Sequence, residues 1–307
     1  MSPITVVYTL AFLILTYCIL SHSALSLHYA FMGLNLWFQK MVPNLLPFMI
    51  LSGCMVRMKL TEGFTSIVYF FVRPIYKVTR NVCYGMLMGF LCGFPMGAKT
   101  VQELYTRQMI TKQEADYLLA FCNNIGPVYF ISFVLPLLQR QRILPYVFGM
   151  YGIPLLYGLF LRYTFFGSMQ EKNITATELY LNKISFFREL DDAISASVQS
   201  ILSLGGYMIL FNLFNLLPHI LMRKEPIFLA PLLEISGGLS MLQAKAPLYT
   251  LLLLPFGGLS CIAQTYSCLK GTSLSIAKYT LHKIILVVLT ALYYLGWYVW
   301  DSNSFIR

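Results

Sequence analysis

A lysine beside a broken apolar segment is the first feature of this sequence that could do chemistry. Residues 92–104 read CGFPMGAKTVQEL, and Gly93, Pro95 and Gly97 interrupt any helix just before Lys99. A half-helix that begins after such a break presents free N–H groups and the positive end of its dipole, which suit an anion. Lys99 adds a full positive charge at the same place. We therefore predict an anion-binding site at this break.

Two further polar features interrupt apolar stretches. Asn123 and Asn124 open the run NNIGP, and their amides offer donors and acceptors without charge. Glu234 is a carboxylate well inside an apolar segment. Burying an ionisable group in a membrane costs free energy, so its presence there indicates a role in function. We expect Glu234 to pair with Lys99, to bind a coupling cation or to carry a proton. The structural alternatives are a snorkelling Lys99, asparagines that bond between helices, and a Glu234 that caps broken backbone.

A second glycine break resembles the first. Residues 258–269 read GLSCIAQTYSCL, and aligned with residues 93–104 they place Gly258 opposite Gly93 and Gln264 opposite Lys99. We expect Gly258, Ser260 and Gln264 to line the same substrate site, with Gln264 as the neutral counterpart of Lys99.

The composition predicts a membrane protein. The 307 residues are 58% hydrophobic and 11% charged, whereas a soluble domain has roughly 25% charged residues. The net charge of +10 is spread over short connections, where it marks membrane topology rather than nucleic-acid binding. The seven cysteines and four histidines show no metal-ligand spacing. With no catalytic grouping visible, we expect no metal, no cofactor and no enzymatic activity.

The positions of the apolar segments predict the elements that hold these residues. An amphipathic helix at 63–80 is expected to lie at the membrane surface. Residues 139–142, which read QRQR, are expected to form a tight basic turn, and residues 166–189 are expected to form a hydrophilic loop that could include a short surface helix. Spanning helices are expected at 3–21, 40–58, 114–138, 143–165, 190–217 and 274–299.

Two segments with glycine breaks, 82–105 and 246–269, are predicted to be re-entrant hairpins because each half is too short to span. Three spans separate them, so the second hairpin would enter from the opposite face. The predicted fold class is thus an all-α polytopic membrane protein with an inverted repeat. Residues 1–307 are expected to form one domain, with repeats at about 40–139 and 190–300.

The broken segments resemble a known family. GFPMGAK at 93–99 and FCNNIGP at 121–127 are similar to motifs of the "nucleoside recognition" Gate-domain membrane proteins, which include sporulation and spore maturation proteins. The resemblance covers most of residues 40–290. It implies a core like that of concentrative nucleoside transporters, with paired hairpins. For sporulation-associated members it implies export of dipicolinic acid across the outer forespore membrane.

The leading hypothesis is an alternating-access transporter of dipicolinate, or a similar small anion, in a bacterial cell membrane. Lys99 would hold a carboxylate, Asn123 and Asn124 would orient the ring or the second carboxylate, and Glu234 would bind a coupling cation or carry a proton. The alternatives are a nucleoside or nucleobase transporter and a non-transporting membrane protein of spore assembly. The expected partners are the anion and the lipid bilayer, and a homo-oligomer is left open.

Overall fold

The computed structural model describes residues 2–138, 143–167 and 186–304, and every element in these ranges is a helix. The predicted basic turn at 139–142 and most of the predicted loop at 166–189 lie outside the described residues. The all-helical prediction is confirmed for the part of the chain that the structure describes.

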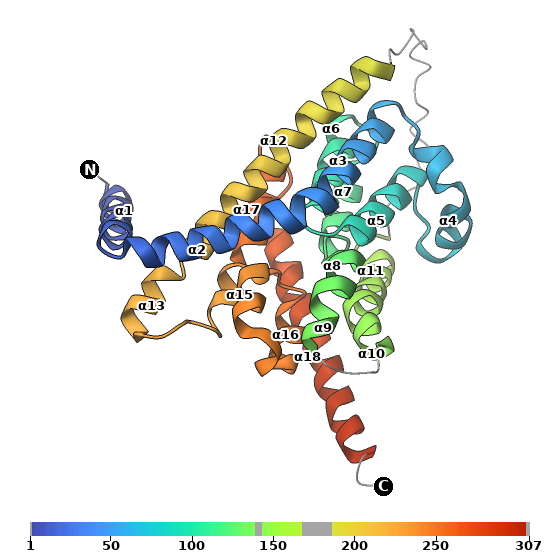
Figure 1. The fold of residues 1–307 in the computed structure, drawn as a ribbon. Helices are drawn as coiled ribbons and strands as arrows, with labels where there is room; N and C mark the ends of the chain where they lie inside the picture. Colours follow the sequence, from blue (N-terminus) through green and yellow to red (C-terminus); the bar gives the residue numbers. More distant parts are fainter. Residues whose placement is uncertain (1, 139–142, 168–185, 305–307) are drawn as a thin grey trace.

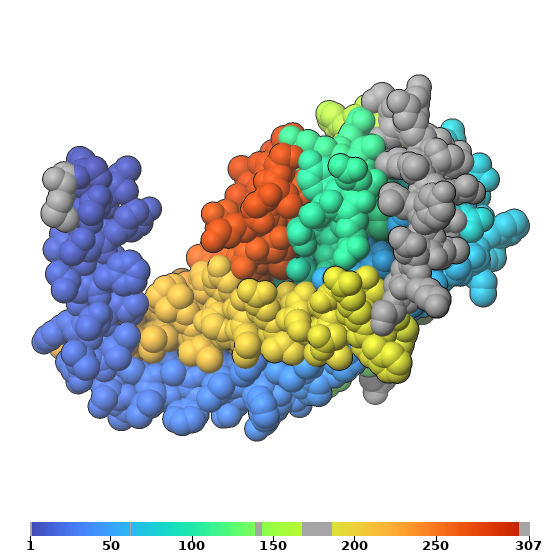
Figure 2. Space-filling view, turned by 90° about the horizontal axis from the view of Figure 1, so that it is seen from above, coloured from blue at the N-terminus to red at the C-terminus, as the bar shows by residue number. Residues whose placement is uncertain are grey.

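The N-terminal third begins with one peripheral helix, which contacts α2 and α13, and one very long helix. Helix α1 (Pro3–Ser21) has no buried residue. Helix α2 (Ser23–Leu36), the π-turn η1 (Trp37–Met41) and α3 (Val42–Arg57) follow without interruption. Helix α12 (Phe186–Leu213) packs along α2 and α3, and Figure 2 shows this contact as a yellow helix lying against a blue one.

The predicted amphipathic helix at 63–80 is observed as α4 (Thr61–Tyr76), which ends where Lys77 adopts a left-handed conformation (φ 48°). Next come α5 (Arg80–Cys92) and α6 (Met96–Thr106), which pack against each other. A Cβ added at Gly97 would lie 3.1 Å from the Cα of Gly89, so glycines permit this close packing. The two helices form a helical hairpin at the predicted position, residues 82–105.

A broken helix follows the hairpin. Helix α7 (Lys112–Phe121) starts with a capping box between Thr111 and Glu114, and it ends at residues 122–126. The chain then continues through α8 (Pro127–Tyr129), the π-turn η2 (Phe130–Val134) and α9 (Leu135–Leu138). Proline at the first position of α8 suits a helix start because its missing N–H is not needed there.

The remaining elements complete the bundle (Figure 1). They are α10 (Leu144–Val147), η3 (Phe148–Gly152), α11 (Ile153–Thr164), α13 (Leu216–Met222), α14 (Ala230–Leu233), α15 (Ile235–Leu242), η4 (Gln243–Lys245), α16 (Pro247–Leu253), α17 (Gly258–Leu269) and α18 (Ile276–Ser304).

Five stretches of described helix are long and apolar enough to cross a membrane, by length and composition. Together with the composition, they make the chain an integral membrane protein. They are Pro3–Ser21, Leu144–Thr164, Phe186–Met222, Pro247–Leu269 and Ile276–Trp300.

Helix α18 is unbroken from Ile276 to Ser304, so its start and its end serve as markers for two opposite ends of the helical bundle. Near its start, the Lys278 ammonium lies 3.8 Å from the Asp116 carboxylate of α7. Near its end, the ring of Trp297 lies 5.5 Å from that of Tyr146 in α10. The first end therefore carries the start of α7, and the second carries the start of α10.

These markers do not confirm the predicted hairpin at 246–269. Pro247 lies in a small cavity with Tyr146 and Trp297, at the second end. Ser273 lies just after the C-terminus of α17 and hydrogen-bonds Tyr105 of α6 at 2.8 Å. This contact places the C-terminus of α17 at the first end of the molecule. Residues 247–269 thus pass from one end to the other, although the helix is broken between α16 and α17. The glycines there interrupt the helix without reversing the chain, so entry from the opposite face is not confirmed either.

Candidate functional site

The breaks of α5–α6 and α7–α8 are packed directly on one another. The backbone N–H of Phe94 donates to the carbonyl of Asn124 at 2.7 Å. Gly93 has φ +77°, and a Cβ added there would overlap the backbone nitrogen of Gly126 and lie 2.7 Å from its Cα. Only glycine fits both the dihedral angle and the space. The two predicted breaks therefore form one junction.

Asn123 ties this junction to two other helices. Its Oδ1 accepts from the backbone N–H of Ala98, in the first turn of α6, at 3.3 Å. Its Nδ2 donates to the hydroxyl of Thr265 in α17 at 3.1 Å and to that of Tyr279 in α18 at 3.0 Å. The α6 N-terminus predicted to attract an anion therefore already has a polar partner in Asn123. This contact supports the interhelical-bond alternative, while a contact of Asn123 with substrate stays a prediction.

A buried cation that the sequence analysis missed lies beside the same junction. Lys283 of α18 is fully buried. Its Nζ donates to the carbonyl of Asn123 and, at 2.9 Å, to the Oδ1 of Asn124. The Nζ also lies 4.6 Å from the ring centre of Phe94 and 5.6 Å from that of Tyr279. The available signal was a lysine in the middle of the apolar stretch 274–299.

Lys99 lies on the wall of a different space, a polar cavity of about 260 Å³ between α6, α12 and α17. The predicted site residues Pro95 and Gln264 line it too, and a second lysine, Lys270, faces it. No carboxylate is among its described lining residues. The other polar ones are Gln102, Gln199, Ser200, Ser203, Tyr207 and Ser267.

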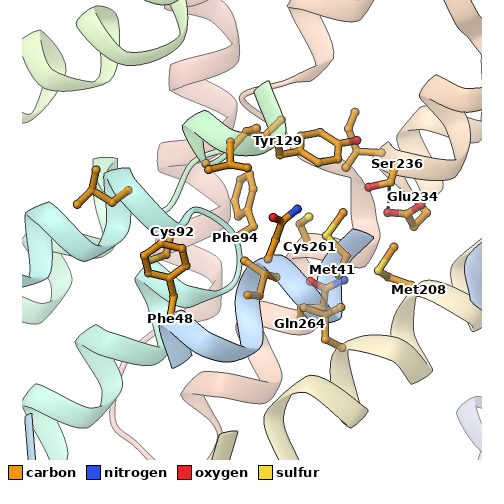
Figure 3. A pocket seen from close by; sticks show the side chains of 18 residues that line it. Met41, Phe48, Cys92, Phe94, Tyr129, Met208, Glu234, Ser236, Cys261 and Gln264 are labelled. Carbon is orange, nitrogen blue, oxygen red and sulfur yellow. Dashed lines mark hydrogen bonds between the residues drawn. The ribbon is translucent and has the colours of Figure 1, made fainter. Parts of the chain in front are cut away.

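Gln264 and Leu204 line both this polar cavity, which we call the Lys99 cavity, and a smaller one. The smaller cavity, about 70 Å³ and mostly apolar, is also lined by Gln264, together with Phe94, Tyr129 and Glu234. Figure 3 shows Phe94, Gln264 and Glu234 arranged around this inner cavity. The Gln264 amide donates to the hydroxyl of Ser260 at 2.9 Å, one turn earlier on α17.

Gly258 opens α17 against the break between α14 and α15. Its φ is +82°, and a Cβ added there would lie 3.1 Å from the carbonyl oxygen of Pro231 and 3.2 Å from the nitrogen of Ile235. Gly258 therefore lets the two breaks approach, as Gly93 does at the first junction.

Glu234 caps the N-terminus of α15. One carboxylate oxygen accepts from the N–H of Ser236 at 3.1 Å. The other accepts from the N–H of Gly237 at 2.6 Å and from the Asn212 amide at 3.0 Å. Within the described part of the chain it has no lysine partner, and Lys99 and Glu234 line different cavities. The capping alternative is therefore what the geometry supports, while a role in ion coupling stays a prediction.

This capping role predicts a stability effect. We expect Glu234→Ala to lower the free energy of unfolding by about 3 kcal/mol, because it leaves buried N–H groups without a partner. Thermal unfolding of the purified protein in detergent would measure the loss. Glu225→Ala, at an exposed position in the connection before α14, is the matched control and should be neutral. Equal stability of Glu234→Ala and Glu225→Ala would contradict the capping role.

The sequence was compared with known proteins. It is 28% identical over 223 residues to the sporulation integral membrane protein YlbJ of Bacillus subtilis. The match covers 66% of this chain and 54% of YlbJ, so the chain spans about half the length of that curated relative. No family model matches, and no solved structure matches. Similarity to a sporulation membrane protein is therefore confirmed, and membership of the Gate-domain family stays a prediction.

The predicted site residues divide into three neighbouring groups. Lys99 and Pro95 face the Lys99 cavity, and Glu234 faces the inner cavity. Gly93, Gly97, Asn123 and Asn124 form the junction beside Lys283. Gln264 belongs to both cavities and is held by Ser260. The predicted residues therefore lie in one region of the fold but do not converge on a single point, and their role in binding stays a prediction.

Proposed function

We propose that this chain is a membrane transporter of a small organic anion, with dipicolinic acid as the leading substrate. The observation that carries the proposal is the Lys99 cavity, which is polar and faced by two lysines, with no carboxylate among its described lining residues. Two ammonium groups complement a dianion. Dipicolinate is a small aromatic dianion, and the glutamine and serine groups of the wall can bond its carboxylates.

The inner cavity supports a path beyond the Lys99 cavity. Because Gln264 lines both spaces, a shift of its side chain would connect them. Phe94 and Tyr129 give the inner space aromatic walls suited to a flat ring. We propose alternating access, in which the broken helices move around Gln264.

The arrangement of the breaks also favours a revised inverted repeat. The α5–α6 hairpin, which we propose to be re-entrant, opens at the end that carries the start of α7, since Thr79 bonds Glu114 at 3.3 Å. The α14–α15 pair opens at the other end, where η4 contacts α9. We propose that these two pairs correspond, rather than the segments 82–105 and 246–269.

The broken helices support the same pairing. The stretch α7–α9 starts beside Lys278 at the first end, whereas α16–α17 starts beside Trp297 at the second. They run in opposite directions, as two halves of an inverted repeat would.

The cellular process in which this chain is proposed to act is inferred from its similarity to YlbJ. YlbJ is described as a sporulation integral membrane protein, so we propose that this chain also acts in sporulation. The outer forespore membrane is the proposed location, because dipicolinate would have to cross it to enter the spore.

A binding measurement tests the substrate. Dipicolinate should raise the thermal unfolding midpoint of the purified protein in a saturable way, because a ligand that binds the native state stabilises it. Isophthalate, which has the same carboxylates but no ring nitrogen, is the matched control and should act more weakly. Selective stabilisation by uridine would favour the nucleoside alternative. No stabilisation by any of these ligands, together with no dipicolinate flux in proteoliposomes, would contradict transport.

A further inference from the structure

The amine of Lys283 is buried at the junction of the two helix breaks. Its Nζ is held by the Asn123 carbonyl and the Asn124 side-chain oxygen, and two aromatic rings cover it. No described carboxylate forms an ion pair with it. An unpaired charge in a buried position is costly, so this arrangement needs a physical reason.

The surroundings of Nζ are those of a cation site. Helix α7 ends at Phe121, so its C-terminal carbonyls and the negative end of its dipole point towards the break. Uncharged carbonyl oxygens are the ligands that pore and transporter proteins use for Na⁺ and K⁺. The faces of Phe94 and Tyr279 add the attraction of aromatic rings for a positive charge.

The position of the site also matches the position of coupling ions. In transporters with broken helices, the unwound carbonyls at the break coordinate the cation that drives transport. Here the break of α7–α8 supplies those oxygens, but an uninterrupted neighbouring helix, α18, delivers an amine to them. The side chain of Lys283 is therefore a cation that is covalently attached to the protein.

We propose that the Lys283 amine occupies a site that would otherwise bind a monovalent metal cation, and that this chain needs neither Na⁺ nor K⁺ at the junction. The occupancy of the site stands independently of transport. The further statement that Lys283 replaces a coupling ion rests on the proposed function.

Removing the amine should uncover the metal site. In choline chloride, Lys283→Ala is expected to lower the unfolding midpoint by roughly 5 °C relative to the unchanged protein. NaCl, KCl or methylammonium chloride should restore the midpoint of Lys283→Ala in a saturable way, because each supplies a small cation to the vacated oxygens. Choline is too large to enter, so ionic strength alone should restore nothing.

Two matched variants separate a cation site from simple packing. Lys283→Met removes the amine but keeps an unbranched side chain as long as the Lys283 chain to its Cε, which fills most of the space. This variant should be destabilised but not rescued by any cation. Lys278→Ala removes a largely exposed lysine of the same helix and should show neither loss nor rescue. A Lys283→Ala protein that no small cation stabilises would overturn the proposal.

The unchanged protein supplies a second test that does not depend on the folding of a variant. Its unfolding midpoint should be the same in choline, sodium and potassium chloride at equal concentration. Saturable stabilisation by Na⁺ or K⁺ that Asn124→Leu abolishes would mean that the junction binds a metal despite Lys283, and would also overturn the proposal. Dipicolinate enters neither measurement, so failure here is distinct from failure of the transport proposal.

Discussion

Replacing Gly93 with alanine is expected to prevent stable folding of the chain. Gly93 has φ 77° and ψ −164°, a region essentially restricted to glycine. The added methyl group would also overlap the backbone of Gly126, which cannot move aside as a flexible side chain can. We expect a loss of at least about 3 kcal/mol of stability, seen as loss of the protein from the membrane fraction.

A second glycine provides the matched control for this substitution. Gly206 lies within α12, and nothing lies within 4 Å of a Cβ added there. Gly206→Ala should leave expression unchanged or raise stability slightly, since alanine favours a helix by about 1 kcal/mol. Normal yield and thermal stability of Gly93→Ala would show that the close packing of the two breaks is not required.

The second large effect is expected at Lys99. Lys99→Ala removes one of the two ammonium groups that face the Lys99 cavity. Loss of one charge-assisted hydrogen bond should weaken dipicolinate binding by about 10- to 100-fold. Titration of the purified protein and dipicolinate uptake into proteoliposomes would both measure this loss. Lys99→Arg keeps the charge and should retain part of the binding.

Lys112→Ala is the control for charge near the same end of the molecule. Lys112 is exposed at the start of α7 and does not line the Lys99 cavity. The Lys112→Ala variant should therefore bind dipicolinate as tightly as the unchanged protein does. If Lys99→Ala and Lys112→Ala bind equally well, the anion does not bind at Lys99.

Much of the fold could be predicted from local residue types. The glycines and proline at 93–97, the run NNIGP at 123–127 and the glycines at 257–258 each lie at an observed helix break. These residues act through their own backbone, so their effect is visible in a short window of sequence. The region of the candidate site was predictable for the same reason.

The pairing of the segments was harder to predict. Residues 82–105 and 246–269 share a glycine break, yet the first reverses the chain and the second continues across the molecule. Whether a broken helix turns back depends on what packs on each half. Helix α6 packs on α5, so the chain turns back there. By contrast, α16 packs on α18, and α17 packs on α6 and α12. A local sequence pattern does not show which of these contacts form.

Lys283 was missed because its role depends on distant residues. The stretch 274–299 is apolar enough to be an ordinary span, and the two lysines within it, Lys278 and Lys283, do not change that assignment. The role of Lys283 at the junction is visible only in the folded structure, where Asn123 and Asn124 from another part of the chain lie beside it. Glu234 is buried, as its place in an apolar segment predicts, and its partners are two backbone N–H groups and the Asn212 amide. Its role in function stays a prediction.

The contacts at the junction also set an order for biogenesis. Asn123 is separated by 142 residues from Thr265 and by 160 from Lys283, so its partners in α17 and α18 are synthesised much later. At about 5–20 residues per second, the ribosome needs roughly 10–30 s to reach them. During that interval the broken α7–α8 segment sits in the membrane with unsatisfied polar groups. The growing chain is therefore most exposed to membrane quality-control proteases, or most dependent on an insertase, until α18 arrives.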